Sequence, residues 1–453
     1  MPWVSADNMA LLVDQYELTM LRAYYAESMA EQAVFSLFVR RLPEDRNYLL
    51  ACGLETVLAY LERVRFDDDA RAYLESMGPF DEAFLDWLMD LRFRGDVWAV
   101  PEGTPVFADE PILEVRGSLP EAQLVETFVM NQIHLQTVLA SKASRVRHAA
   151  GERKVVDFGL RRMHGADAGL RSARAFHVAG LDATSNVLAG RTYGIPVTGT
   201  MAHSYVQAHD DEMAAFRAFT RTFPDTILLV DTYQTLDGVR NVVRLAEELG
   251  DRFRVRGVRL DSGDLAELAK ATRGILDAAG LGNVEIFASG GLDEHAIGEL
   301  VRGGAPIDGF GVGTGMGVSR DAPSLDMAYK LTEYDGRGRL KLSSGKPVLP
   351  GRKQVFRIEE EGGAVRDVIA RADEALPGRP LMEKVMEGGA RLEAGRTSLE
   401  DARSRAREEL ARLPERVRKL EAATPPYAVD VSESLGQLQK DIERKVTDRE
   451  TTS

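Results

Sequence analysis

Cysteine is almost absent from the sequence, since Cys52 is the only one among 453 residues. This excludes a disulfide framework and a cysteine-rich metal cluster, and it fits a reducing cytosol. The sequence also lacks an uncharged apolar run of the roughly 18 residues that a membrane-spanning helix needs. The first residues show neither a basic region nor an apolar core, so we expect no signal peptide. These absences predict a cytoplasmic protein with no membrane partner.

Positive charge is also scarce. The chain has 57 Lys and Arg against 71 Asp and Glu, which gives a formal net charge of −14. Broad nucleic-acid binding is therefore not expected, because it depends on neutralising phosphates with basic side chains. Small anionic substrates stay possible, because a few arginines can gather in one site. The hydrophobic fraction of 44% and the length are those of a globular protein with two or three domains.

Three regions differ in their pattern. Residues 1–150 predict an α+β domain, with helices at 9–29, 54–91 and 120–150 and an antiparallel, meander-like sheet from strands at 33–39, 97–100, 105–107 and 112–115. Residues 151–335 predict an α/β barrel. Residues 336–453 predict C-terminal strands and a charged helical extension that starts at Ser398.

The middle region alternates strands and helices. Its β-branched runs lie at 155–158, 197–200, 227–231, 257–261, 285–289 and 309–313. Such alternation indicates parallel βα units, in a barrel or in an open doubly wound sheet. A barrel builds its active site at the carboxyl ends of its strands. Those ends carry Asp157, Thr200, Asp231, Asp261, Ser289 and Gly313.

Charged side chains near these ends suggest chemistry. Arg161 and Arg162 follow a strand beside glycines and are suited to holding a carboxylate or phosphate, although a surface pair is equally compatible. Arg259 alternates with Asp261 along one strand, so both point to one side if the strand continues. Asp231 and Asp261 are suited to binding Mg²⁺ or ribose hydroxyls or to stabilising a cation, or they cap helices.

A histidine and several glycines complete the set. His203 directly follows Gly199-Thr200-Met201-Ala202, where it is suited to act as acid, base or nucleophile, although a lone His is more often structural. The pair Gly290-Gly291 and the run that contains Gly313 are suited to a phosphate site. No Walker-type loop occurs. Together these residues indicate a phosphosugar-handling enzyme.

The motifs resemble those of nicotinate phosphoribosyltransferase, a type II phosphoribosyltransferase. The resemblance runs in order from about residue 8 to residue 357, and no motif is matched beyond about 390. It is carried by Asp14-Gln15-Tyr16-Glu17-Leu18-Thr19-Met20, Asp157-Phe158-Gly159-Leu160-Arg161-Arg162, Thr184-Ser185-Asn186-Val187-Leu188-Ala189-Gly190, Gly199-Thr200-Met201-Ala202-His203-Ser204, Leu229-Val230-Asp231-Thr232-Tyr233, Val258-Arg259-Leu260-Asp261-Ser262-Gly263-Asp264 and Gly311-Val312-Gly313-Thr314.

The resemblance implies a fold and a reaction. The fold is an irregular α/β barrel with an N-terminal α+β domain completed by C-terminal segments. The reaction transfers phosphoribosyl from 5-phosphoribosyl diphosphate (PRPP) to nicotinate, with nicotinate mononucleotide and diphosphate as products in NAD salvage. ATP hydrolysis is coupled to the transfer through a phosphohistidine, which places the family in the ligase class. Mg²⁺ is the implied metal, and its ligands are not specified.

The resemblance also implies roles for single residues. His203 matches the phosphorylated histidine. Tyr16, Thr200 and Arg259 match nicotinate contacts. Phe158 would pack on the pyridine ring, and Thr314 matches a phosphoribosyl contact. Tyr16 is presented across a dimer interface, which implies a homodimer with shared active sites.

Substrate choice has its own signal. The nicotinamide-using relatives carry an Asp in the segment that corresponds to Thr184-Ser185-Asn186-Val187, and this chain has none there. Nicotinate is therefore favoured over nicotinamide, although Asp182 lies close by. The two alternatives are a nicotinamide phosphoribosyltransferase and a catalytically silent protein that senses pyridines. A silent protein is expected to have lost His203 or Arg259, and both are present.

Overall fold

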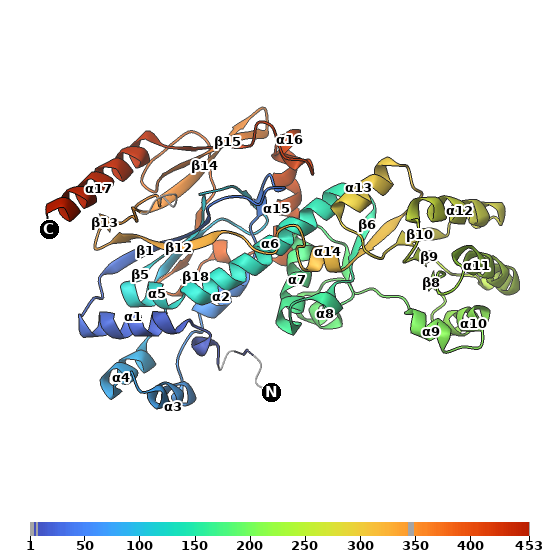
Figure 1. Ribbon diagram of the computed structural model, residues 1–453, viewed down its shortest axis with the longest axis horizontal. Coiled ribbons are helices and arrows are strands. Elements are labelled where there is room, and N and C mark those ends of the chain that lie inside the picture. Colours follow the sequence, from blue (N-terminus) through green and yellow to red (C-terminus); the bar gives the residue numbers. More distant parts are fainter. Residues whose placement is uncertain (1–3, 6–7, 343–347, 453) are drawn as a thin grey trace. The chain divides into compact units, whose positions relative to one another are not determined.

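The computed structural model describes residues 4–5, 8–342 and 348–452 and divides into two compact units. Residues 1–138 and 324–453 form the first unit, and residues 139–323 form the second (Figure 1). The sequence placed boundaries near 150 and 335. Residues after 335 do not form a unit of their own but join the N-terminal residues.

A seven-stranded antiparallel sheet forms the centre of the first unit, in the order β13-β12-β1-β5-β3-β17-β18. Its strands are β1 Gln32–Val39, β3 Asp96–Ala99, β5 Pro111–Ser118, β12 Met327–Tyr334, β13 Arg337–Gly338, β17 Glu383–Glu387 and β18 Ala390–Arg391. The expectation of a meander is wrong, because β1 lies between β5 and the distant β12. Seven of the eight residues of β1 are buried, so both of its faces are covered.

C-terminal segments complete this unit. A four-stranded sheet contains β16 Arg379–Pro380, β14 Lys353–Glu360, β15 Gly363–Arg371 and β19 Ala428–Val431, and a small sheet pairs β2 Leu49–Leu50 with β4 Pro105–Val106. The rings of Phe107 and Tyr427 stack 4.0 Å apart in one buried cluster. The N-terminal and C-terminal parts therefore share a core, as the fold class required.

The helices of the first unit are shorter than expected. They are α1 Gln15–Ala26, α2 Leu54–Leu61, α3 Asp68–Met77, α4 Glu82–Asp90, α5 Leu119–Leu124, α15 Leu399–Arg412, α16 Glu415–Arg418 and α17 Glu433–Thr452, with single turns η1 Met9–Leu11 and η4 Glu393–Gly395. The expected helix at 54–91 is three helices, because Asp67 and Asp81 each cap a new start and Gly78 ends α3 at a φ of 93°. The expected helix at 120–150 breaks at Val125 into α5 and α6 Glu126–Ala150.

Six parallel strands form the sheet of the second unit, in the order β7-β6-β11-β10-β9-β8. They are β6 Lys154–Asp157, β7 Ala183–Thr184, β8 Ile227–Leu229, β9 Gly257–Leu260, β10 Glu285–Ala288 and β11 Gly309–Val312. Within the described residues β7 and β8 do not pair, so the sheet is an incomplete barrel, which confirms the α/β class. The expected strand at 197–200 is wrong, because Val197 makes only one bridge, to Thr184.

Helices connect these strands, as the alternation predicted. They are α7 Ala166–Val178, α8 Val187–Tyr193, α9 His203–Gln207, α10 Glu212–Thr222, α11 Thr235–Leu249, α12 Leu265–Ala278, α13 Glu294–Arg302 and α14 Thr314–Gly317, with turns η2 Leu160–Arg162 and η3 Gly250–Arg252. None of the helices in the described part of the chain has the length and apolar character that crossing a membrane requires.

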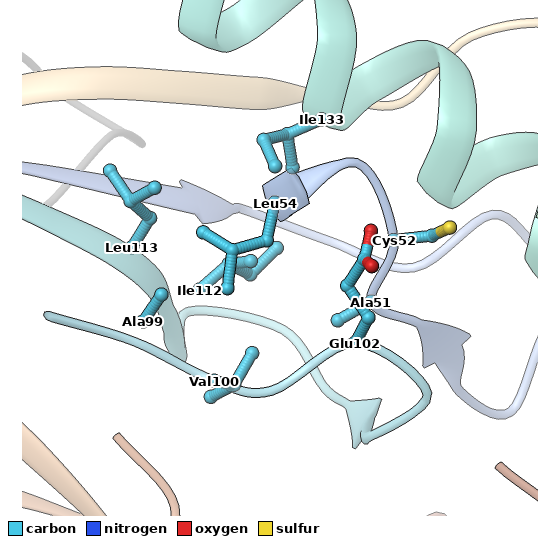
Figure 2. Close-up of a pocket in the computed structure, with 9 residues that line it drawn as sticks. All are labelled: Ala51, Cys52, Leu54, Ala99, Val100, Glu102, Ile112, Leu113 and Ile133. Carbon is cyan, nitrogen blue, oxygen red and sulfur yellow. The ribbon is translucent and has the colours of Figure 1, made fainter. Parts of the chain in front are cut away.

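The single cysteine borders a small cavity in the first unit (Figure 2). Cys52 is 1% exposed, and the cavity measures about 10 Å³, which is room for roughly one water molecule. Its walls are mostly apolar, and the Glu102 carboxylate among them accepts the Gly53 N–H at 2.6 Å. This cavity is too small for an organic substrate.

Candidate functional site

The carboxyl ends of the parallel strands gather polar residues at one edge of the second unit. Phe158 follows β6, Asp231 lies two residues beyond β8, and Asp261 and Ser289 directly follow β9 and β10. Because parallel strands end on the same side, these residues lie along one edge of the sheet, with β11 between β6 and β10. The edge therefore brings together the strand-end residues that the sequence singled out, apart from Thr200.

An aromatic ring lies over the middle of this edge. A Cβ on Gly311 would lie 2.4 Å from the Phe158 ring, so the ring covers the missing side chain of Gly311 in β11. The guanidinium carbon of Arg259 lies 5.9 Å from the centre of the same ring, near the limit for a cation–π contact. A flat apolar surface and a cation thus lie beside each other.

Arg259 is fixed in place and keeps an unused donor. Its Nη2 donates to the Met201 carbonyl at 2.9 Å, while its buried Nε has no hydrogen-bond partner. Burial lowers the pKa of Arg259, the charges of Asp261 and Asp231 raise it, and the charge of Arg161 lowers it again. A buried guanidinium with an unused donor and another arginine nearby fits a carboxylate or phosphate ligand.

Each of the two candidate carboxylates is fixed by residues that follow the neighbouring strand. Asp231 is 7% exposed, and its Oδ2 accepts the Asp261 N–H at 2.9 Å and the Ser262 hydroxyl at 2.6 Å. Asp261 accepts the hydroxyl of Ser289 through Oδ1. The buried Oδ1 of Asp231 has no partner. Both carboxylates are therefore oriented, and one keeps a free lone-pair site.

His203 begins helix α9 close to these carboxylates. Its Nδ1 lies 3.2 Å from the Thr232 hydroxyl, and its Nε2 lies 3.7 Å from Asp261 Oδ2. The side chain is 40% exposed. Hydrogen bonding at one ring nitrogen orients the other, so Nε2 is presented to Asp261 and to solvent.

Two of the three candidate glycines lie close to another backbone segment. Gly290 has a φ of 87°, and a Cβ there would lie 1.9 Å from the Asp261 carbonyl oxygen. Gly291 also has positive φ but faces open space. A Cβ on Gly313 would lie 3.3 Å from the Phe158 carbonyl oxygen, and the half-buried Thr314 follows it. These residues line the same edge, and their contact with a phosphate stays a prediction.

The remaining candidates of this unit differ in position. Arg161 and Arg162 are exposed in the turn η2. Thr200 lies in a loop rather than at a strand end, and its hydroxyl reaches only the neighbouring Met201 carbonyl, at 3.4 Å. Asp157 is 1% exposed, and its carboxylate accepts the Gly159 N–H and the Thr184 hydroxyl, so it shapes the loop from inside.

The structure also gives the contacts of Asp182 and Asn186, which lie in or beside the segment that bears on the choice between nicotinate and nicotinamide. Asp182 accepts the N–H of Val155 at 2.8 Å and a guanidinium hydrogen of Arg147 at 3.3 Å, so its carboxylate faces the start of β6. Asn186 caps helix α8 through the Ala189 N–H. The Asn186 amide also donates to the Gly169 carbonyl at 3.1 Å, so both ends of the amide are used within the unit.

Tyr16 lies in the first unit, in the first turn of α1. It is 47% exposed, and its hydroxyl is hydrogen-bonded to Glu126. Burial, followed by the charges of Glu126 and Glu17, raises the pKa of Tyr16. The phenol therefore stays protonated at neutral pH, with its ring open to a ligand.

Sequence reasoning missed several supporting residues. Thr232 contacts His203, Ser262 holds Asp231, and Gly311 makes room for the Phe158 ring. Thr232 and Ser262 each stand directly after a strand-end Asp in the printed sequence. That adjacency was the available signal, because a hydroxyl next to such an Asp is placed to orient a neighbouring group.

A metal site made of protein ligands alone is not seen in the described residues, where no three His, Cys, Asp or Glu side chains cluster suitably. Mg²⁺ commonly takes one or two carboxylates and completes its shell with water and substrate phosphates. The unpaired Oδ1 of Asp231 fits that kind of ligand set.

Models of one protein family match the chain in three consecutive segments. The nicotinate phosphoribosyltransferase N-terminal domain matches residues 11–134, the nicotinate phosphoribosyltransferase family matches residues 153–357, and its C-terminal domain matches residues 376–439. The C-terminal match includes residues beyond about 390, where the sequence analysis matched no motif of the family.

Individual relatives agree. Nicotinate phosphoribosyltransferase pncB2 of Mycobacterium tuberculosis is 55% identical over 432 residues, which are 95% of this chain and 93% of that protein. The Bacillus subtilis nicotinate phosphoribosyltransferase is 42% identical, over 82% of this chain and 78% of its own length. The crystal structure of human nicotinic acid phosphoribosyltransferase matches with a TM-score of 0.85 and 30% identity, over 94% of this chain and 99% of the human one.

Proposed function

Since this chain belongs to the nicotinate phosphoribosyltransferase family and transfers phosphoribosyl from PRPP to nicotinate, we propose that it does so through a phosphorylated His203 and Mg²⁺-bound PRPP. The single observation that carries the proposal is the arrangement of His203 beside Asp261, with Asp231 fixed behind it. ATP is then a co-substrate, and the enzyme belongs to the ligase class.

Nicotinate binding is assigned to the ring and the arginine. The Phe158 ring offers a surface for the pyridine, and the unused Nε donor of Arg259 offers a charged hydrogen bond to the carboxylate. Thr200 adds a hydroxyl in the same loop that supplies the Met201 carbonyl to Arg259. A cationic pocket of this kind selects nicotinate over nicotinamide.

The position of Asp182 supports this selection. Its carboxylate is occupied by a backbone N–H and by Arg147, at the start of β6. It is therefore not available to accept a hydrogen bond from an amide at the other end of the strand. Catalytic efficiencies on the two pyridines test this, and a preference for nicotinamide would refute it.

Asp231 and Asp261 are assigned to stabilising the transition state of phosphoribosyl transfer. Displacement at C1 of the ribose develops positive charge on the sugar, which a fixed carboxylate stabilises without rearrangement. Asp231 and Asp261 are fixed by hydrogen bonds from Ser262 and Ser289. Mg²⁺, held by the diphosphate and by the free Oδ1 of Asp231, would neutralise the leaving group.

The phosphate groups of PRPP are assigned to the loops around these residues. Arg161 and Arg162 are exposed at the edge and free to turn toward an anion. The backbone at Gly290, Gly291 and Gly313, followed by Thr314, offers N–H groups without side chains in the way.

ATP coupling is assigned to His203. Phosphorylation adds about 1.5 to 2 negative charges by analogy with other phosphoryl groups. Placed next to Asp261, this charge changes the affinity for Mg²⁺ and PRPP. Differential affinity between the phosphorylated and free enzyme is what allows ATP hydrolysis to drive binding.

A homodimer with shared sites completes the proposal, with Tyr16 of a second copy contributing to the nicotinate pocket. The 47% exposure of Tyr16 supports it, as do three exposed apolar side chains near the end of β7, namely Val187, Leu188 and Val197. Cys52 is buried and is the single cysteine of the sequence, which fits the cytoplasmic location that we propose.

The test is His203→Ala, with His209→Ala as the control. His209 lies in the same segment, but its Nδ1 contacts the Tyr205 carbonyl at 2.8 Å rather than the site. We expect His203→Ala to abolish ATP hydrolysis, ATP stimulation and acid-labile labelling from ATP, while slow ATP-independent transfer survives. His209→Ala should keep all of them. Persistent labelling of the His203 variant would remove that residue from the mechanism.

A further inference from the structure

The first turn of α1, which carries Tyr16, is tied to the start of α6 by one side chain. Asp14 caps α1 and Glu17 lies in its first turn, while Thr127 is the second residue of α6. The Thr127 hydroxyl lies 2.9 Å from Asp14 Oδ2 and 2.5 Å from Glu17 Oε1. We call Asp14, Glu17 and Thr127 the α1 latch. Asp14 and Glu17 flank Tyr16 along the chain.

Two backbone hydrogen bonds complete the α1 latch. The Asp14 N–H donates to the Thr127 hydroxyl at 3.2 Å, and the Thr127 N–H donates to Glu17 Oε1 at 3.1 Å. The Thr127 oxygen therefore has three partners, one N–H and two carboxyl oxygens.

The number of hydrogens available at the Thr127 hydroxyl limits the protonation state of the α1 latch. A threonine hydroxyl has one hydrogen to donate and two lone pairs that accept. It accepts the Asp14 N–H and has one hydrogen for two carboxyl oxygens, so one of the two carboxyls must carry a hydrogen of its own. Glu17 is the buried carboxyl of the pair and Asp14 the exposed one, so Glu17 is the group placed to carry it. With Glu17 protonated, every contact of the hydroxyl is satisfied.

The surroundings of Glu17 supply that proton at neutral pH. Glu17 is fully buried, and burial raises its pKa to about 8, with the hydrogen bonds from Thr127 lowering it and the charges of Glu126 and Asp14 raising it. The phenols of Tyr60 in α2 and Tyr329 in β12 also face Glu17. No cation contributes to the shift of Glu17 itself.

Tyr16 is held at both ends by this arrangement. Its backbone lies between Asp14 and Glu17, and its hydroxyl is hydrogen-bonded to Glu126, the residue before Thr127. Glu126 is in turn fixed by Gln123 Nε2 at 2.7 Å. The first turn of α6 therefore determines where the exposed Tyr16 ring lies.

We propose that Thr127 and protonated Glu17 are positioning residues that hold Tyr16 for nicotinate, and that the hold weakens when Glu17 ionises in alkaline solution. The proposal rests on the role of Tyr16 proposed above. On ionisation the Glu17 proton leaves to solvent. One Thr127 hydrogen then remains between two carboxylates, so one of its two contacts is lost.

The experiment measures kcat and the KM values of nicotinate and PRPP between pH 6.5 and 9 on the full-length enzyme. For the wild type, the KM for nicotinate should rise above about pH 8 while the KM for PRPP stays level. Glu17→Gln, which is neutral at every pH, should remove that rise. Thr127→Val should raise the KM for nicotinate about fivefold at pH 7, the worth of one hydrogen bond, and Thr127→Ser should restore it.

A control and a reference variant separate the outcomes. Thr137→Val removes another buried hydroxyl of α6, one that accepts the Cys52 N–H and donates to the Cys52 carbonyl, and should leave the KM for nicotinate unchanged. Tyr16→Ala tests the role of Tyr16 itself. If Tyr16→Ala leaves the KM for nicotinate unchanged, the proposed role of Tyr16 fails. If Tyr16→Ala raises it while Thr127→Val and Glu17→Gln behave as wild type, the α1 latch is refuted.

Discussion

Replacing Glu17 by Gln should stabilise the protein at neutral and alkaline pH, with an effect that grows as the pH rises toward 8. Burial raises the pKa of Glu17 from 4.5 to about 8. A carboxyl whose folded-state pKa is raised contributes its full stability below pH 4.5 and loses it as the pH rises toward 8. Gln carries no proton to lose, so the variant escapes that penalty.

The size of the effect follows from the shift. Each pH unit above 4.5 costs the wild type about 1.4 kcal/mol of unfolding free energy, or about 3 kcal/mol at pH 7, until the cost levels off near pH 8. The Gln side chain cannot reproduce both hydrogen bonds to Thr127, which gives a pH-independent offset of about 1 kcal/mol. The slope with pH, rather than the absolute difference, is therefore diagnostic.

Urea unfolding followed by tryptophan fluorescence measures that slope. Trp87 of α4 lies 5.3 Å from Tyr25 of α1, so its emission reports on this part of the first unit. The difference between variant and wild type should grow by about 3 kcal/mol between pH 5 and pH 7.5. Glu27→Gln, at the exposed end of the same helix, controls for the loss of one carboxylate. A difference for Glu17→Gln that stays constant over this range refutes the burial of a protonated Glu17.

Three further predictions concern the site and the core. Arg259→Ala should raise the KM for nicotinate roughly 10- to 100-fold in steady-state assays, the worth of a charged hydrogen bond, with little change in the KM for PRPP. Gly311→Ala should displace the Phe158 ring, because the new Cβ would lie 2.4 Å from it, and should lower kcat/KM for nicotinate about tenfold while circular dichroism stays native. Glu110→Gln should raise the melting temperature at pH 8 but not at pH 5. Burial and the charge of Asp367 hold the pKa of Glu110 well above its usual range, so the buried carboxyl destabilises the wild type as the pH rises. An equal gain in melting temperature at both pH values would contradict this.

The parallel strands and their polar ends could be predicted from sequence. A short β-branched run predicts a strand, and an Asp or Gly directly after the run marks the carboxyl end of that strand. In a barrel the residues just beyond these carboxyl ends form the active site. Five of the six predicted strands lie where they were expected, and the sixth, at 197–200, is reduced to a bridge at Val197. That loop instead carries the Met201 carbonyl that fixes Arg259.

Contacts between distant segments could not be predicted in the same way. Nothing near Glu17 in the sequence shows that it is buried, because its partner Thr127 lies on another helix. The association of Phe107 with Tyr427 is equally invisible to local patterns. Sequence periodicity predicts which face of a helix or strand is apolar. It does not predict which distant helix or strand packs against that face, because this depends on how the chain between them folds back.

The two units fix their functional groups by different means, and this leads to different responses to pH. In the second unit, Asp231 and Asp261 are held by donors, namely a backbone N–H and the hydroxyls of Ser262 and Ser289, which keep their hydrogens throughout the physiological range. In the first unit, the turn around Tyr16 depends on a hydrogen that Glu17 itself must carry. A rise in pH therefore weakens the contacts that position Tyr16 before it changes the hydrogen bonds that hold Asp231 and Asp261. We therefore expect the KM for nicotinate to rise in alkaline solution while the KM for PRPP stays level.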